Sequence, residues 1–151
     1  MAEQVLQTYA NHGRIIPLYH IGCSGILALN LLWRIYLLYG ALSAGHGRGD
    51  TGMNFLVAIA LLLIWFFARI QPLTAQDRVI RLEETLRMEK LFPPPLKARI
   101  SEFTPGQFIS LRFASDAELP ELAAKVLDGK ITDRKAIKQM IKNWRPDYLR
   151  V

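Results

Sequence analysis

Residues 53–70 read MNFLVAIALLLIWFFARI, and no ionisable side chain occurs between Leu56 and Phe67. An α-helix of this length extends about 27 Å, close to the hydrocarbon thickness of a bilayer. Such a helix satisfies its backbone hydrogen bonds internally, which lipid requires. The stretch therefore predicts a membrane-spanning helix.

A second apolar stretch, IIPLYHIGCSGILALNLLWRIY, occupies residues 15–36. It predicts another span, because it is longer than the apolar core of a signal peptide. Its polar side chains fall on one stripe of about 120° when residues are placed at 100° intervals. They are His20, Cys23, Ser24, Asn30 and Arg34. Polar side chains within a span face protein rather than lipid, so we expect this stripe to contact the second span or a partner subunit.

His20 raises an alternative, because a histidine can be an axial ligand of haem, or of chlorophyll, inside a membrane. A single histidine is a weak signal for such a site. Cys23, the only cysteine, lies among apolar residues and is expected to behave as a small hydrophobic side chain. We therefore expect no cofactor and no metal.

The placement of Lys and Arg predicts the orientation of the two spans. The connector between them, SAGHGRGDTG (43–52), contains Arg48 as its one basic residue, whereas Arg69 and Arg78 follow the second span. The C-terminal half is therefore expected in the cytoplasm. Two spans then place the N-terminus, with Arg14, on the same side of the membrane.

The composition changes sharply after the second span. Fifteen of the nineteen Lys and Arg residues and eleven of the thirteen acids lie in the second half of the chain. We therefore expect an all-α protein that begins with a transmembrane helical hairpin as a membrane anchor over 1–72. A charged stalk helix over 73–92 and a small cytoplasmic helical domain over 93–151 are expected to follow. Pro72 is expected to end the second span, and Thr74 to cap the stalk.

The predicted stalk has a narrow apolar stripe formed by Val79, Leu82 and Leu86. A charged helix with such a stripe is typical of a stalk that lies on its own domain or makes a small coiled-coil contact. Two pairs in which an acid precedes a base by four residues support the helix. They are Asp77 with Arg81 and Glu83 with Arg87.

Short helices with recognisable start signals follow Pro93-Pro94-Pro95, which ends the stalk. We expect them near 96–102, 105–113, 116–128 and 133–144. Their caps are predicted at Thr104, at Ser115 with Glu118 as a capping box, at Gly129 as a C′ residue and at Thr132. No stretch alternates long enough to predict a strand. The expected core is Phe108, Leu111, Leu119, Leu122, Val126, Leu127, Ile137, Met140, Ile141 and Trp144.

The last predicted helix has an apolar face and a basic face. The basic face consists of Lys135, Lys138, Lys142 and Arg145. Such a face on a membrane-anchored domain can lie near anionic headgroups, dock an acidic partner or simply be solvated. The helices near 116–128 and 133–144 also have helix-turn-helix spacing, although the dispersed acids make nucleic acid a weaker alternative.

Four segments carry a resemblance to known proteins. They are NHGRIIPLYH (11–20), QDRVIRLEE (76–84), LRFASDAELPEL (111–122) and ITDRKAIKQMIKNWRPDYLRV (131–151). They resemble a family of small bacterial membrane proteins that is catalogued only as a domain of unknown function. The resemblance implies a bacterial inner-membrane protein with two spans, and it implies no reaction and no catalytic residues.

The sequence contains no Gly-rich phosphate loop, no HExxH motif and no Ser, His and Asp set, so we expect no enzymatic activity. The expected role is an accessory or scaffold subunit of a larger membrane complex, which docks other membrane subunits through the hairpin and the cytoplasmic domain. The alternative is a membrane-tethered regulator that binds anionic lipid or nucleic acid through the basic last helix. A homo-oligomer is compatible with either role.

Overall fold

A computed structural model describes residues 7–11, 13 and 15–148 of the chain. Helices are the regular elements of this described part, which contains no strand, so the predicted all-α class is confirmed. The chain divides into two units, one within Arg14–Pro72 and the other formed by described residues of Leu73–Val151 and Met1–Gly13. Arg14, for which a cytoplasmic position was predicted, and the last three residues of the C-terminal segment lie outside the described residues.

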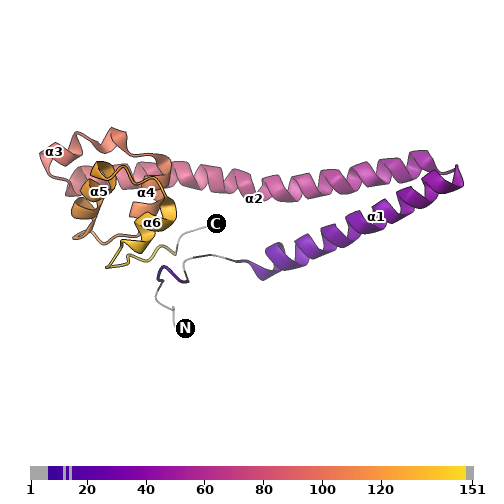
Figure 1. Ribbon diagram of the computed structural model, residues 1–151, viewed down its shortest axis with the longest axis horizontal. Helices are drawn as coiled ribbons and strands as arrows, with labels where there is room; N and C mark the ends of the chain where they lie inside the picture. The colour runs from indigo at the N-terminus through magenta and orange to yellow at the C-terminus, as the bar shows by residue number, and fades with distance from the viewer. Residues whose placement is uncertain (1–6, 12, 14, 149–151) are drawn as a thin grey trace. The chain divides into compact units, whose positions relative to one another are not determined.

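The first unit contains a π-helical segment, η1 (Leu18–Cys23), which continues into α1 (Ser24–Ala44), and the N-terminal part of α2 (Arg48–Leu91) (Figure 1). Residues 18–44 and α2 are each long and apolar enough to cross a membrane. Gly45 ends α1 with a φ of 80°, and its N–H donates to the Ala41 carbonyl at 3.1 Å. Only glycine adopts this left-handed conformation without a steric cost, which is why a glycine ends the helix here.

Helix α2 does not end at Pro72, as the sequence predicted, but continues to Leu91. A proline inside a helix removes one backbone hydrogen bond and costs about 3 kcal/mol. Strong helix formers lie on both sides of the proline, so the helix continues through it. They include Ala68 and Arg69 before it and Leu73, Ala75 and Gln76 after it. Thr74 consequently lies inside the helix and does not cap a new one.

The second unit forms around the C-terminal part of α2, where the orange and yellow helices gather in Figure 1. Its elements are α3 (Pro94–Lys97), η2 (Ile100–Glu102), α4 (Pro105–Leu111), α5 (Leu119–Asp128) and α6 (Arg134–Gln139). Helix α4 packs against both α5 and α6. The single helix predicted near 96–102 is therefore two short elements, α3 and η2.

The core of this unit contains most of the apolar residues that the sequence predicted. Phe108, Leu111, Leu119, Leu122, Val126, Leu127 and Ile137 are buried, and Met140 and Ile141 pack against them. Helix α2 adds Met88 and is followed by Phe92, which the spacing of the short helices could not reveal. Val79, Leu82 and Leu86 stay exposed, so the apolar stripe of α2 is not the face that the domain covers.

The helix caps follow the sequence where their partners are local. Thr104 caps α4 as predicted, and Gln107 completes a capping box with it. Half of the capping box predicted at Ser115 is present, because the Ser115 hydroxyl accepts from the Glu118 N–H at 3.4 Å. The other half does not form, because the Glu118 carboxylate accepts hydrogen bonds from residues far along the chain instead. Asp133, not Thr132, caps α6, since its carboxylate accepts from two backbone N–H groups of the first turn.

The last helix is shorter than predicted, because α6 ends at Gln139 and not near residue 144. Beyond it, the chain from Met140 to Tyr148 has no helix, and we call this segment the C-terminal tail. Gly129 follows α5 as expected but has a φ of −78°, and the left-handed residue in this turn is Lys130, with a φ of 48°.

Candidate functional site

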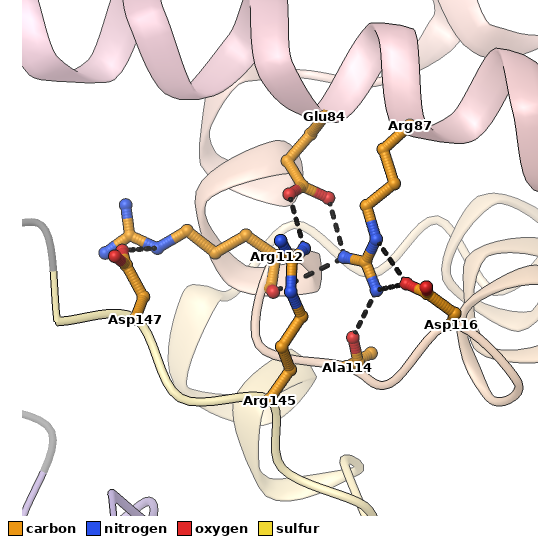
Figure 2. A network of polar contacts seen from close by, with 7 residues as sticks. All are labelled: Glu84, Arg87, Arg112, Ala114, Asp116, Arg145 and Asp147. Atoms are coloured by element: carbon orange, nitrogen blue, oxygen red, sulfur yellow. Dashed lines mark hydrogen bonds and ion pairs between the residues drawn. The ribbon is translucent and has the colours of Figure 1, made fainter.

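A buried carboxylate on α2 is the centre of the polar network in Figure 2. Glu84 is only 5% exposed, and it lies on the side of α2 that faces the rest of the second unit. Arg87 Nη1 donates to its Oε2 at 2.9 Å, and Arg145 Nη1 donates to its Oε1 at 3.3 Å. Each oxygen of the carboxylate thus has an arginine, as a buried charge requires.

Arg87 connects this carboxylate to the segment that joins α4 to α5. Its Nη2 donates to the Ala114 carbonyl at 2.7 Å, and its Nε donates to Asp116 Oδ1 at 2.8 Å. Nη1 also lies 3.4 Å from the Arg112 carbonyl oxygen. One guanidinium therefore binds two carboxylates and two backbone carbonyls, which uses the planar fork that distinguishes arginine from lysine.

A third arginine binds the tail. Arg112 Nε lies 3.3 Å from Asp147 Oδ2, and its guanidinium lies 4.5 Å from the centre of the Phe113 ring, within the range of a cation–π contact. The backbone of Asp147 also pairs with the Gln7 side chain, which accepts from its N–H at 2.8 Å and donates to its carbonyl at 3.2 Å.

The tail is fixed to the same segment by backbone contacts. Glu118 accepts hydrogen bonds from the N–H groups of Lys142 at 2.9 Å and Asn143 at 2.8 Å. Ala114 and Trp144 form an antiparallel bridge. The Trp144 ring stacks on Phe113 with 4.7 Å between ring centres. These contacts explain why the chain stops being helical after Gln139: the tail satisfies its backbone groups across the domain.

A groove of about 890 Å³ runs beside the network. Its charged lining includes Glu83, Lys90 and the residues of the network, and its apolar lining includes Val79, Leu86 and Tyr148. Burial raises the pKa of Glu84, and the nearby arginines oppose this rise without overcoming it. The groove therefore carries both signs of charge, and its buried acid is already bound by arginines.

Three of the four segments that carry the resemblance meet in this network. Glu84 ends the segment 76–84, Arg112 and Asp116 belong to 111–122, and Arg145 and Asp147 belong to 131–151. A comparison with family profiles matches residues 1–151, the whole chain. The chain belongs to DUF6526, a family of unknown function. No curated protein and no solved structure matches it.

The structure places the predicted polar stripe of this DUF6526 chain on the partly buried side of the first unit. His20, Ser24, Asn30 and Arg34 are each partly buried, as are Leu27, Leu31, Leu37 and Leu38 at the same helical spacing. Most of the intervening side chains are exposed. On α2, Phe55, Ala58, Leu62 and Trp65 recur at three- and four-residue intervals with reduced exposure. The two elements contact each other where the Tyr19 hydroxyl donates to the Trp65 carbonyl and the two rings stack.

His20 itself is engaged with its own helix. Its Nδ1 lies 3.0 Å from both the N–H and the carbonyl oxygen of Ile16, and the Ser24 hydroxyl donates to its carbonyl. These contacts join Ile16 and Ser24 to His20 on either side of η1, where the backbone is wider than an α-helix, so the 100° spacing does not hold between His20 and Asn30. Among the described residues, no group of three or more His, Cys, Asp and Glu side chains is arranged to hold a metal ion.

The four predicted basic residues do not share one helical face. Lys135 and Lys138 lie on α6, whereas Lys142 and Arg145 lie on the tail, because the helix ends earlier than predicted. Lys138 Nζ lies 5.3 Å from the centre of the Phe113 ring, and Arg145 binds Glu84. Lys135, Lys142 and Arg145 are exposed and Lys138 is partly buried, so Lys135 and Lys142 are the two that are exposed without one of these contacts.

The sequence interpretation missed the central residues of the network. It paired Arg87 with Glu83 through local spacing, but the structure pairs Arg87 with Glu84 and with Asp116, 29 residues away. Arg112 and Asp147 were not singled out at all. The segments that carry the resemblance are rich in charged residues. This clustering was the one signal in the sequence that could have indicated ion pairs between those segments.

Proposed function

We propose that this protein is a non-enzymatic accessory or scaffold subunit, anchored by a transmembrane helical hairpin in the inner membrane of a bacterium. The apolar surface of the first unit supports the anchor. Ile26 and Ile64 are 69% and 64% exposed, and neighbouring apolar residues on both helices are exposed as well. A water-soluble protein buries such side chains, whereas lipid covers them at no cost.

The orientation follows from the basic residues that flank the hairpin. We infer a cytoplasmic second unit, because Arg69 and Arg78 follow the second span while Arg48 is the one basic residue of the glycine-rich connector. The same reasoning places the N-terminus in the cytoplasm. The chain would then present its helical domain to cytoplasmic parts of a membrane complex.

The observation that carries the non-enzymatic role is the pairing of acids and arginines in the network. Glu84, Asp116 and Asp147 each have an arginine nitrogen within 3.3 Å. A general acid or base must be able to reach a substrate and exchange a proton with it. These carboxylates instead bind α2, the segment after α4 and the tail to one another, which supports a structural role for the charges.

The partly buried polar stripe supports docking within the membrane. Asn30 and Arg34 are only partly buried by the rest of the chain, and polar groups that face lipid are unfavourable, so contact with a further protein would complete their burial. We propose that the hairpin packs against other membrane subunits and that the cytoplasmic domain docks on the same complex.

The test is purification of the full chain from native membranes in a mild detergent, followed by measurement of the particle mass and identification of its components. We expect a second subunit in a fixed ratio, and release of the chain from membranes only by detergent. A variant with Asn30→Leu is expected to lose the second subunit, whereas Leu29→Val on an exposed position is expected to keep it. Particles that contain this chain alone would contradict the proposal.

A further inference from the structure

An exposed apolar stripe runs along the part of α2 that belongs to the second unit. Val79, Leu82 and Leu86 are 54%, 62% and 52% exposed, and Ala75 extends the stripe by one position. Their spacing of four, three and four residues is that of the a and d positions of a coiled coil. This part of α2 thus has the seam of a two-heptad coiled coil on its surface.

The domain covers a different face of the same helix. Ile80, Glu84 and Met88 are buried against the domain. At 3.6 residues per turn, the centres of the two faces lie about 165° apart. The domain therefore packs on one side of α2 and leaves the apolar stripe exposed, with Val79 and Leu86 also lining the edge of the groove beside the network.

Charged residues beside the stripe indicate what partner it fits. With Val79 and Leu86 at a positions and Leu82 at a d position, Arg78 occupies g and Glu83 occupies e. Both side chains are exposed, and neither forms a salt bridge with a described residue. In a parallel dimer a g residue faces the e residue five positions later on the other helix. Arg78 of each copy would therefore face Glu83 of the other.

We propose that two copies of this chain pair in parallel through this stripe of α2. An antiparallel pair would bring like charges together, g with g and e with e, so the charge pattern selects the parallel arrangement. Two heptads associate weakly in free solution. Insertion of both copies in one membrane orients the helices alike and raises their effective concentration. The pairing therefore rests on the proposed membrane anchor, which supplies both the common orientation and the high effective concentration.

Disulfide trapping of the full chain in native membranes tests the pairing. In a Cys23→Ser background, Leu82→Cys places one thiol at a d position, where the two copies of residue 82 would approach within disulfide range. We expect mild oxidation to give a covalent dimer. The matched control is Arg81→Cys, which is exposed on the same helix but lies on another face. Equal dimer yields at the two positions, or trapping of Leu82→Cys to a different protein, would overturn the proposal.

Charge reversal tests the register. Arg78→Glu and Glu83→Arg are each expected to weaken pairing about tenfold, because each replaces two attractive pairs by two repulsive ones. The double variant restores both attractions, so the yield of trapped dimer should return toward that of the parent. A double variant that dimerises no better than either single variant would overturn the parallel register.

The two proposals fail separately. A particle that contains one copy of this chain and a second subunit would overturn the dimer and leave the accessory role intact. A particle with two copies and no other subunit would support the dimer and contradict the accessory role.

Discussion

Replacement of Arg87 by methionine tests whether the network holds the second unit together. Methionine keeps most of the apolar stem of the side chain and removes the guanidinium. Glu84 would then be left buried with Arg145 as its remaining partner, and the side chain of Arg145 is 50% exposed. The Ala114 carbonyl, in a residue with no exposed surface, would lose the Arg87 hydrogen bond.

The magnitude follows from the burial of each contact. Breaking a buried ion pair costs about 3–5 kcal/mol, because one charge is left without compensation. The contact with Asp116 adds little, because that side chain is 68% exposed and solvent screens the pair. We take the lower end of the range, about 3 kcal/mol, because Arg145 still binds Glu84. A domain of this size has a total stability of only about 5 kcal/mol.

Hydrogen exchange of the full chain in detergent, read by mass spectrometry, reports this loss for individual helices. We expect the buried amides of α4 and α5 to exchange about a hundred times faster, since each 1.4 kcal/mol is worth about a factor of ten. The matched control is Arg99→Met. Arg99 also binds two carboxylates, Glu102 and Asp128, but solvent reaches all three side chains and screens these pairs, so this change should alter the exchange of α4 and α5 little.

A double variant separates two effects: the loss of the Arg87 contacts, and the uncompensated charge that Arg87→Met leaves on buried Glu84. Glu84→Gln together with Arg87→Met removes both charges, and we expect it to recover a large part of the stability that Arg87→Met loses. Equal exchange in the Arg87→Met and Arg99→Met variants, or a double variant as unstable as Arg87→Met, would refute the reasoning.

Three further changes have defined outcomes. Burial raises the pKa of Glu84 above 4.5, so this group favours folding below that pH, and its contribution is lost as the pH rises through the raised value. Glu84→Gln should therefore flatten the dependence of stability on pH above 4.5, as measured by thermal unfolding at stepped pH. Thr104→Ala removes the capping box of α4 and should cost about 1 kcal/mol in the same assay, whereas Thr132→Ala, at a position that caps no helix, should cost less than half of that. Gly129→Ala should destabilise the second unit, because the new Cβ would lie 2.9 Å from the Lys125 carbonyl oxygen, and protease resistance of the α5–α6 turn would report it.

The sequence predicted the features that depend on neighbouring residues. Thr104 and Pro105 form a cap and a first helical turn on their own, so the start of α4 agrees with the prediction. The apolar residues of α4 and α5 recur at helical spacing, and they form the core as expected. The continuous apolar stretches likewise predicted two helices long enough to cross a membrane.

The features that the sequence did not predict depend on contacts between distant residues. Glu118 matches the local pattern of a capping box, yet its carboxylate binds two N–H groups of the tail, and the Ser115 N–H that it would bind donates to the Asn143 carbonyl instead. The residues after Gln139 have a helical pattern, but the bridge between Ala114 and Trp144 draws them into an extended chain. Local spacing contains no information about either contact.

The network also indicates why charged residues occur in the segments that carry the family resemblance: they contact one another in the folded domain. Glu84, Arg112 and Arg145 come from three segments separated by about thirty residues each, and they meet because a buried carboxylate needs cationic partners from more than one direction. Without the tail, Glu84 would lose one of its two arginines, so α2 and the tail stabilise each other. The domain therefore depends on the same helix that contains the second apolar stretch.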